Sequence, residues 1–112
     1  MTYLRPSADV MLTAEREVLG FLLDPSVPPE TVREILGRLR SYAFQEVEHQ
    51  VLFDCVVKLS LRPRGELLEY LPACLVRAGF PAIDLERFRG EHRMPPDQAL
   101  RRCATLEPHH TP

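Results

Sequence analysis

Apolar residues recur along this chain at the spacing of one face of an α-helix. The first stripe consists of Val18, Leu19, Leu22 and Leu23. Intervals of three and four residues are typical of an amphipathic helix. Thr13 can cap the start of this helix, and Asp24-Pro25 ends it. Gly20 lies inside the helix, where glycine costs about 1 kcal/mol relative to alanine, so we expect another helix to approach its backbone closely.

Three more helices are predicted before residue 80. Pro28-Pro29 begins one of them, because proline is tolerated in the first turn, and the capping box Thr31-x-x-Glu34 offers an alternative start. Residues 45–60 form the most continuous apolar element and are predicted to be a central helix. A fourth helix, at residues 66–78, contains Pro72, which predicts a kink or a division into two short helices. Gly79 is a suitable C-terminal stop.

The rest of the chain completes an all-α prediction. Asp84 can cap a short helix that ends near Phe88, and Pro95-Pro96-Asp97 begins a last helix. No convincing alternation of apolar and polar residues predicts a strand. We therefore predict a compact bundle of five to seven helices. The expected organisation is a lead-in at residues 1–12, a single helical domain at residues 13–106 and a tail at residues 107–112.

Composition is that of an ordinary globular domain. The chain has 112 residues, of which 45% are hydrophobic, and its net charge is -2. One domain fits this length, and so small a charge gives no strong field for nucleic acid or anionic membranes. We find no signal peptide and no apolar run long enough for a membrane span. A cytoplasmic location without membrane association is the resulting expectation.

Candidate chemistry is sparse. Cys55, Cys74 and Cys103 fit neither a zinc ribbon nor a disulfide framework, and we expect buried thiols. Glu46, Glu48 and His49 could bind a metal together with Asp54, but a second histidine is lacking. A solvated helix N-terminus explains these residues better. No phosphate-binding loop or catalytic motif occurs. We expect no catalytic residue, no metal and no cofactor, and therefore no enzyme.

Four arginines could form a basic edge if two predicted turns are neighbours in space. They are Arg38, Arg40, Arg62 and Arg64. Such an edge could contact an acidic protein or nucleic acid. Acidic residues are interleaved throughout, and no series of aromatic residues accompanies the arginines. Direct nucleic-acid binding is therefore not the favoured interpretation.

Three motifs resemble one family of bacterial replication domains. They are Ala14-Glu15-x-x-Val18-Leu19-Gly20-x-Leu22-Leu23, Phe44-x4-His49-x2-Leu52-Phe53, and Leu71-x3-Leu75-x2-Ala78-Gly79. In their order and in their residue patterns they resemble the helical domain shared by the N-terminus of DnaB-type replicative helicases and the C-terminus of DnaG-type bacterial primases. The last helix, from Pro96 to Cys103, looks more like the primase version. Pro72 departs from the family pattern, and the long helical hairpin of both relatives is absent or shortened.

The resemblance implies a DnaB N-terminal-domain-like fold and a non-enzymatic role. That role is protein–protein interaction in bacterial DNA replication, as a primase–helicase or helicase–loader contact. The expected partner is a replicative helicase or a primase. Aromatic residues and arginine dominate interface energetics, so the candidate contact residues are Phe21, Tyr42, Arg62, Arg64, Tyr70 and Phe80. The alternatives are a self-associating N-terminal domain of a replicative helicase and a small nucleic-acid-binding regulator.

Overall fold

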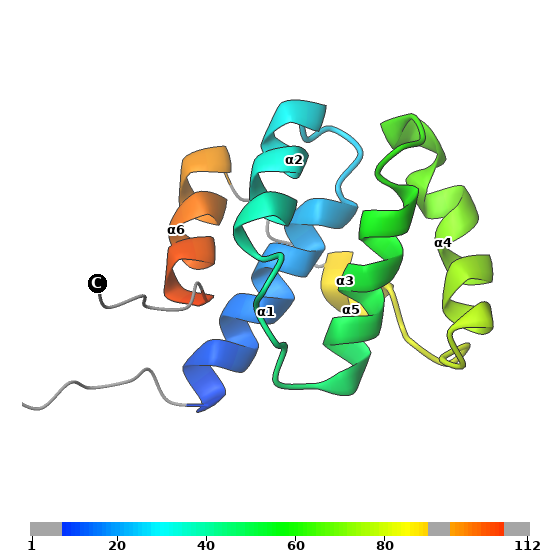
Figure 1. The fold of residues 1–112 in the computed structure, drawn as a ribbon, viewed down its shortest axis with the longest axis horizontal. Helices are drawn as coiled ribbons and strands as arrows, with labels where there is room; N and C mark the ends of the chain where they lie inside the picture. The colour runs from blue at the N-terminus through cyan, green and yellow to red at the C-terminus, as the bar shows by residue number, and fades with distance from the viewer. Residues whose placement is uncertain (1–7, 90–94, 107–112) are drawn as a thin grey trace, which may run out of the picture.

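The computed structural model describes residues 8–89 and 95–106, and this part of the chain is all-helical (Figure 1). It contains six α-helices and a short 3-10 helix, η1, and no strand. Their bounds are α1 Ala8–Leu23, α2 Pro29–Arg38, α3 Val47–Leu59, η1 Arg64–Glu66, α4 Leu67–Arg77, α5 Glu86–Arg89 and α6 Pro96–Leu106. The all-α prediction is confirmed for these residues, and the tail at residues 107–112 lies outside them.

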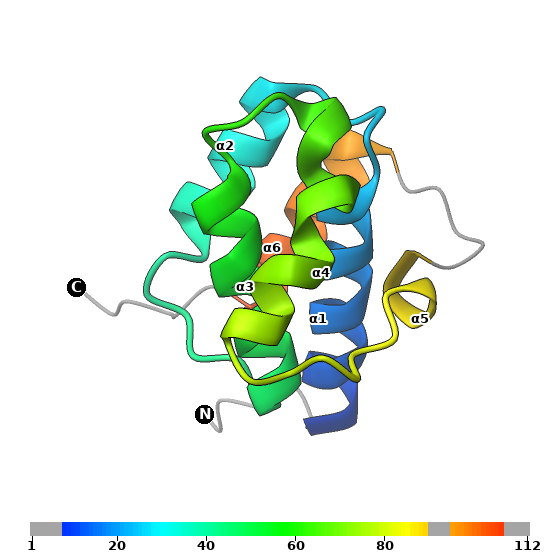
Figure 2. The same cartoon turned by 90° about the vertical axis from the view of Figure 1, so that its right-hand side faces the viewer.

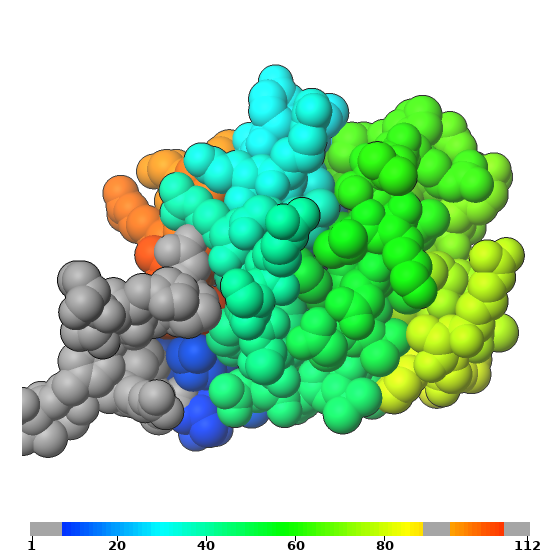
Figure 3. Space-filling view, in the orientation of Figure 1, coloured from blue at the N-terminus to red at the C-terminus, as the bar shows by residue number. Residues whose placement is uncertain are grey.

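Helix α1 is the centre of the bundle. It packs against α3, α5 and α6, while α4 packs on α3 and α2 contacts α6. Figure 2 shows α3 and α4 side by side, with α1 behind them and α5 at one side. On the face seen in Figure 3, α2, α3 and α4 follow one another across the surface. Because α1 runs through the middle, its buried side chains can meet residues from much later in the chain.

One hydrophobic cluster fills the space between the helices. Its fully buried leucine and isoleucine side chains include Leu19, Leu22, Leu23, Ile35, Leu39, Leu52 and Leu71. They lie on α1, α2, α3 and α4, except Leu39, which directly follows α2. Helix α6 adds Ala99, Cys103 and Leu106. No helix in the described part of the chain is both long and apolar enough to cross a membrane.

Both predictions about glycine are confirmed, with a physical reason for each. A Cβ atom on Gly20 would lie 1.9 Å from the carbonyl oxygen of Phe88, so α5 can approach α1 only over a glycine. Gly79 has a φ of 88°, which suits glycine at the end of a helix. The amide of Phe80 then donates to the carbonyl of Leu75 at 2.9 Å, and that of Gly79 to Val76 at 3.0 Å, which completes a Schellman motif.

One predicted helix start and one predicted division are wrong. Helix α1 begins at Ala8, so Thr13 is inside the helix and residues 8–12 do not belong to a lead-in. Helix α4 is one continuous element with Pro72 in its interior, so it is not divided into two short helices. Pro72 is exposed, so water can hydrogen-bond the carbonyl that proline leaves without an amide partner. The starts of α2 at Pro29 and of α6 at Pro96 are as predicted.

Candidate functional site

A buried hydrogen-bonded pair joins helices α1 and α3. Glu15 lies on the core face of α1 and His49 in the first turn of α3, and their exposed fractions are 0% and 1%. Nδ1 of His49 lies 2.7 Å from Oε1 of Glu15. Because a carboxylate can only accept, the Nδ1–H donates this bond. The interpretation of His49 as part of a solvated helix N-terminus is therefore wrong, although Glu48 beside it is exposed.

The second carboxylate oxygen of Glu15 organises the segment between α2 and α3. The hydroxyl of Tyr42 and the backbone amide of Gln45, at 2.8 Å, both donate to Oε2. Gln50 holds the same segment from α3, because its Oε1 accepts the Phe44 amide at 3.0 Å. We call Glu15, Tyr42 and His49 the buried polar centre. It ties α1, α3 and their connection together through one carboxylate.

Hydrogen bonds keep this carboxylate charged. Burial alone raises the pKa of Glu15, but donation from His49, Tyr42 and the Gln45 amide outweighs burial and lowers the pKa from its ordinary 4.5. Burial and the neighbouring carboxylate raise the pKa of Tyr42, so its hydroxyl keeps the proton that it donates. Glu15 is thus held as an acceptor and Tyr42 as a donor, which is a structural arrangement.

The outer side of His49 is covered by two groups. Nε2 lies 3.5 Å from a carboxylate oxygen of Glu46, and the ring of Phe88 in α5 packs edge-to-face at 5.4 Å between centroids. Asp54, the other residue of the weighed metal set, accepts a hydrogen bond from Gln50 at 3.1 Å. Across residues 8–89 and 95–106, no group of three or more metal-ligating side chains converges.

Arg64 has a structural partner in α1. Its Nη2 donates to the carbonyl oxygens of Leu22 and Asp24, each at 2.7 Å. The Leu22 carbonyl lies in the last turn of α1 and has no amide partner within the helix, and the Asp24 carbonyl, just beyond the helix, also accepts the Val27 amide at 3.2 Å. Burial lowers the pKa of Arg64, with Asp24 acting in the opposite direction. Arg64 therefore caps the end of α1, and because it is half-buried, only part of its side chain is accessible to a partner.

The other candidate contact residues differ in how much surface they offer. Phe21 is 6% exposed and belongs to the core, which removes it from the candidates. Tyr42 belongs to the buried polar centre, and Phe80 is half-buried at the end of α4. Arg62 and Tyr70 remain exposed, with the guanidinium 4.4 Å from the ring centroid.

Two exposed apolar residues precede Arg62 closely in the sequence. Leu61 is 95% exposed, and Val57 lies exposed one turn earlier, at the end of α3. We call Val57, Leu61, Arg62 and Tyr70 the α3–α4 corner. Arg62 also pairs with Glu66 at 3.7 Å. Arginine and aromatic residues are enriched at protein interfaces, and here they occur with exposed apolar residues at the same end of α3.

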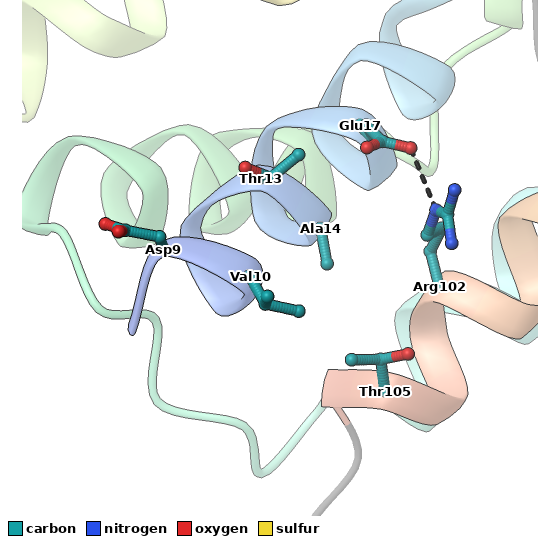
Figure 4. Close-up of a pocket in the computed structure, with 7 residues that line it drawn as sticks. All are labelled: Asp9, Val10, Thr13, Ala14, Glu17, Arg102 and Thr105. Carbon is teal, nitrogen blue, oxygen red and sulfur yellow. Dashed lines mark hydrogen bonds and ion pairs between the residues drawn. The ribbon is translucent and has the colours of Figure 1, made fainter. Parts of the chain in front are cut away.

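A surface hollow lies between the start of α1 and the end of α6. It has a volume of about 320 Å³ and is lined by Asp9, Val10, Thr13, Ala14, Glu17, Arg102 and Thr105 (Figure 4). Nε of Arg102 donates to Glu17 at 2.9 Å across its edge (Figure 4). Two of its three charged side chains, Glu17 and Arg102, therefore already pair with each other, and the lining residues form no catalytic arrangement.

The chain was compared with protein-family models, curated proteins and solved structures, and nothing matched.

Proposed function

We propose that this chain is a non-enzymatic interaction module of bacterial DNA replication, which contacts a replicative helicase. The observation that carries the proposal is the buried polar centre. Glu15 and His49 stand in two separate motifs of the resemblance, and they form one buried pair at 2.7 Å. The motifs that carry the resemblance thus include two residues that depend on each other physically, and this supports the proposal more than apolar spacing does.

Other motif residues support the same interpretation. Val18, Leu19, Leu22, Leu52 and Leu71 are all core residues. Gly20 and Gly79 each occupy a position that only glycine fits without strain. The motifs thus specify a scaffold, and the scaffold leaves the α3–α4 corner as the surface that we assign to partner contact.

Calorimetric titration against the replicative helicase from the same source tests this proposal. We expect saturable binding, with an affinity that changes only modestly between two salt concentrations, because apolar burial contributes most of it. Saturable binding would favour a primase-side or loader-side role. A folded sample that binds neither helicase nor primase would contradict the proposal.

Self-association is the second candidate, favoured by the same exposed apolar residues at the α3–α4 corner. It predicts a dimer or larger assembly in light scattering, whose mass falls on dilution. A monomer at high concentration would refute this candidate and leave the helicase-contact proposal unchanged.

A further inference from the structure

Helix α4 forms one edge of the bundle. Figure 1 shows α3 between α4 and α1, and in Figure 2 α1 lies behind α4. The buried residues Leu67, Leu71 and Leu75 lie on one side of α4. The other side is exposed, and we call it the α4 outer face, which consists of Glu69, Tyr70, Ala73, Val76 and Arg77. Residues three and four apart are neighbours on the surface of a helix, so these residues form one continuous patch.

The α4 outer face has an apolar centre between two opposite charges. Tyr70 is 38% exposed and Val76 is 58% exposed, and the exposed Ala73 lies between them. Glu69 stands one turn before Ala73, and Arg77 stands one turn after it. Within the part of the chain that the structure describes, neither charged residue forms an ion pair. Such a surface fits a partner that offers apolar side chains between the same charges in reverse order.

The order of these residues is complementary to itself. Glu69 and Arg77 lie four residues on either side of Ala73, and Tyr70 and Val76 lie three residues on either side of it. When two copies of α4 run antiparallel and cross at Ala73, each residue lies level with its counterpart beyond the midpoint. Glu69 of one copy then lies level with Arg77 of the other, and the Tyr70 ring lies level with Val76. A two-fold axis makes each of these contacts twice.

We propose that the α4 outer face binds a second copy of this chain, through an antiparallel α4–α4 pair that crosses at Ala73. The distance between packed helices depends on the side chains at their contact, so the small Ala73 lets the helices approach closely. One helix of 11 residues offers less area than the roughly 1,200 Å² buried in a small stable interface, so the dimer should dissociate on dilution. The inference rests on self-association, the second candidate function, and not on helicase contact. It places that contact on α4 instead of at the α3–α4 corner, with which the α4 outer face shares only Tyr70.

Charge reversal on α4 tests the pairing, with analytical ultracentrifugation over a concentration series as the readout. Wild type should pass from monomer to dimer as its concentration rises. Glu69→Arg and Arg77→Glu should each raise the dissociation constant of the dimer at least about tenfold, because each variant places like charges opposite each other. When the two variants are mixed, all facing charges are opposite, so native mass spectrometry should find the heterodimer in excess over both homodimers. Glu30→Arg and Arg33→Glu make the same charge changes at exposed positions of α2. These controls should dimerise like wild type, and their mixture should show no preference for the heterodimer.

A second variant separates the α4 outer face from the α3–α4 corner. Leu61→Ser removes the most exposed apolar side chain of that corner and should leave the dimer unchanged. A dimer that Leu61→Ser dissociates, but that persists in both charge variants, would overturn the inference and leave self-association in place. A wild type that stays monomeric at high concentration would refute both, without consequence for helicase contact.

Thermal stability excludes a purely local role of the two charges. An acidic residue near the start of a helix and a basic residue near its end both favour the helix dipole. If Glu69 and Arg77 act only in this way, the charge variants lose thermal stability but dimerise like wild type, and this result would also overturn the inference. Circular dichroism of each variant before ultracentrifugation ensures that the comparison describes folded protein.

Discussion

Replacing Gly20 with alanine reverses the effect that helix propensity alone predicts. Alanine is favoured over glycine inside a helix by about 1 kcal/mol, and Gly20 lies well inside α1. However, the added Cβ would lie 1.9 Å from the Phe88 carbonyl oxygen and 3.0 Å from its carbonyl carbon. These are backbone atoms, so no side-chain rotation can relieve the overlap, and α5 must move away from α1.

The expected magnitude follows from these opposing effects. Overpacking of a well-packed site costs about 1–3 kcal/mol, and a backbone obstacle belongs near the upper end of that range. After the gain in helix propensity, a net destabilisation of about 1–2 kcal/mol remains. For a domain of this size the melting temperature should fall by about 4–8 °C. The displacement should also loosen the Phe88 ring from His49.

Gly37 provides the matched control, because a Cβ added there meets nothing within 4 Å. It lies in the last turn of α2, where alanine should stabilise the fold by up to about 1 kcal/mol. Urea unfolding followed by circular dichroism measures both variants. If Gly20→Ala is as stable as the wild type, or more stable, the close packing of α5 on α1 is refuted.

Three further predictions concern the polar centre and the helix ends. Glu15→Gln should cost about 3 kcal/mol near neutral pH, because it leaves the buried His49 without its anionic partner. Because its folded-state pKa is lowered, the Glu15 carboxylate contributes fully to stability above its ordinary pKa of 4.5, and this contribution is lost as the pH falls through the folded-state pKa. The urea midpoints of wild type and variant should therefore converge in acid, and a difference that stays constant with pH would contradict this. Arg64→Met should cost about 1.5–3 kcal/mol by removing two charge-assisted bonds at the end of α1, whereas exposed Arg62→Met should cost less than about 1 kcal/mol; equal thermal shifts would refute the capping role. Gly79→Ala should cost about 1–2 kcal/mol in chemical denaturation because of its positive φ, and an unchanged midpoint would exclude that backbone conformation.

Local features of the fold were predictable from the sequence. Pro29 and Pro96 begin helices where proline is tolerated, and Gly79 ends one where a positive φ is needed. The start of α1 was missed because Thr13 is a good capping residue, whereas the apolar face continues back through Met11 and α1 begins at Ala8. Capping preference alone is therefore a weak signal for the residue at which a helix begins.

The buried polar centre could not be derived from periodicity, because Glu15 and His49 lie 34 residues apart along the chain. One signal was present: Glu15 stands within the apolar stripe of its helix, and a charge at a core position requires a partner. The acidic neighbours of His49 suggested a solvated position; Glu48 is indeed exposed, whereas Glu46 lies 3.5 Å from Nε2 of the buried His49. Arg64 was interpreted as surface because only the packed structure brings it to the carbonyl end of α1.

One titration tests the central claim most directly. The wild-type chain, a Leu61→Ser/Tyr70→Ala variant of the α3–α4 corner and a Val47→Ser control are each titrated into the replicative helicase from the same source. Val47 is 66% exposed at the opposite end of α3, so the control removes a similar apolar group elsewhere. We predict saturable binding by wild type and control, and an affinity at least about tenfold lower for the corner variant. Absence of binding by the folded wild type, or equal affinity of all three proteins, would contradict the account.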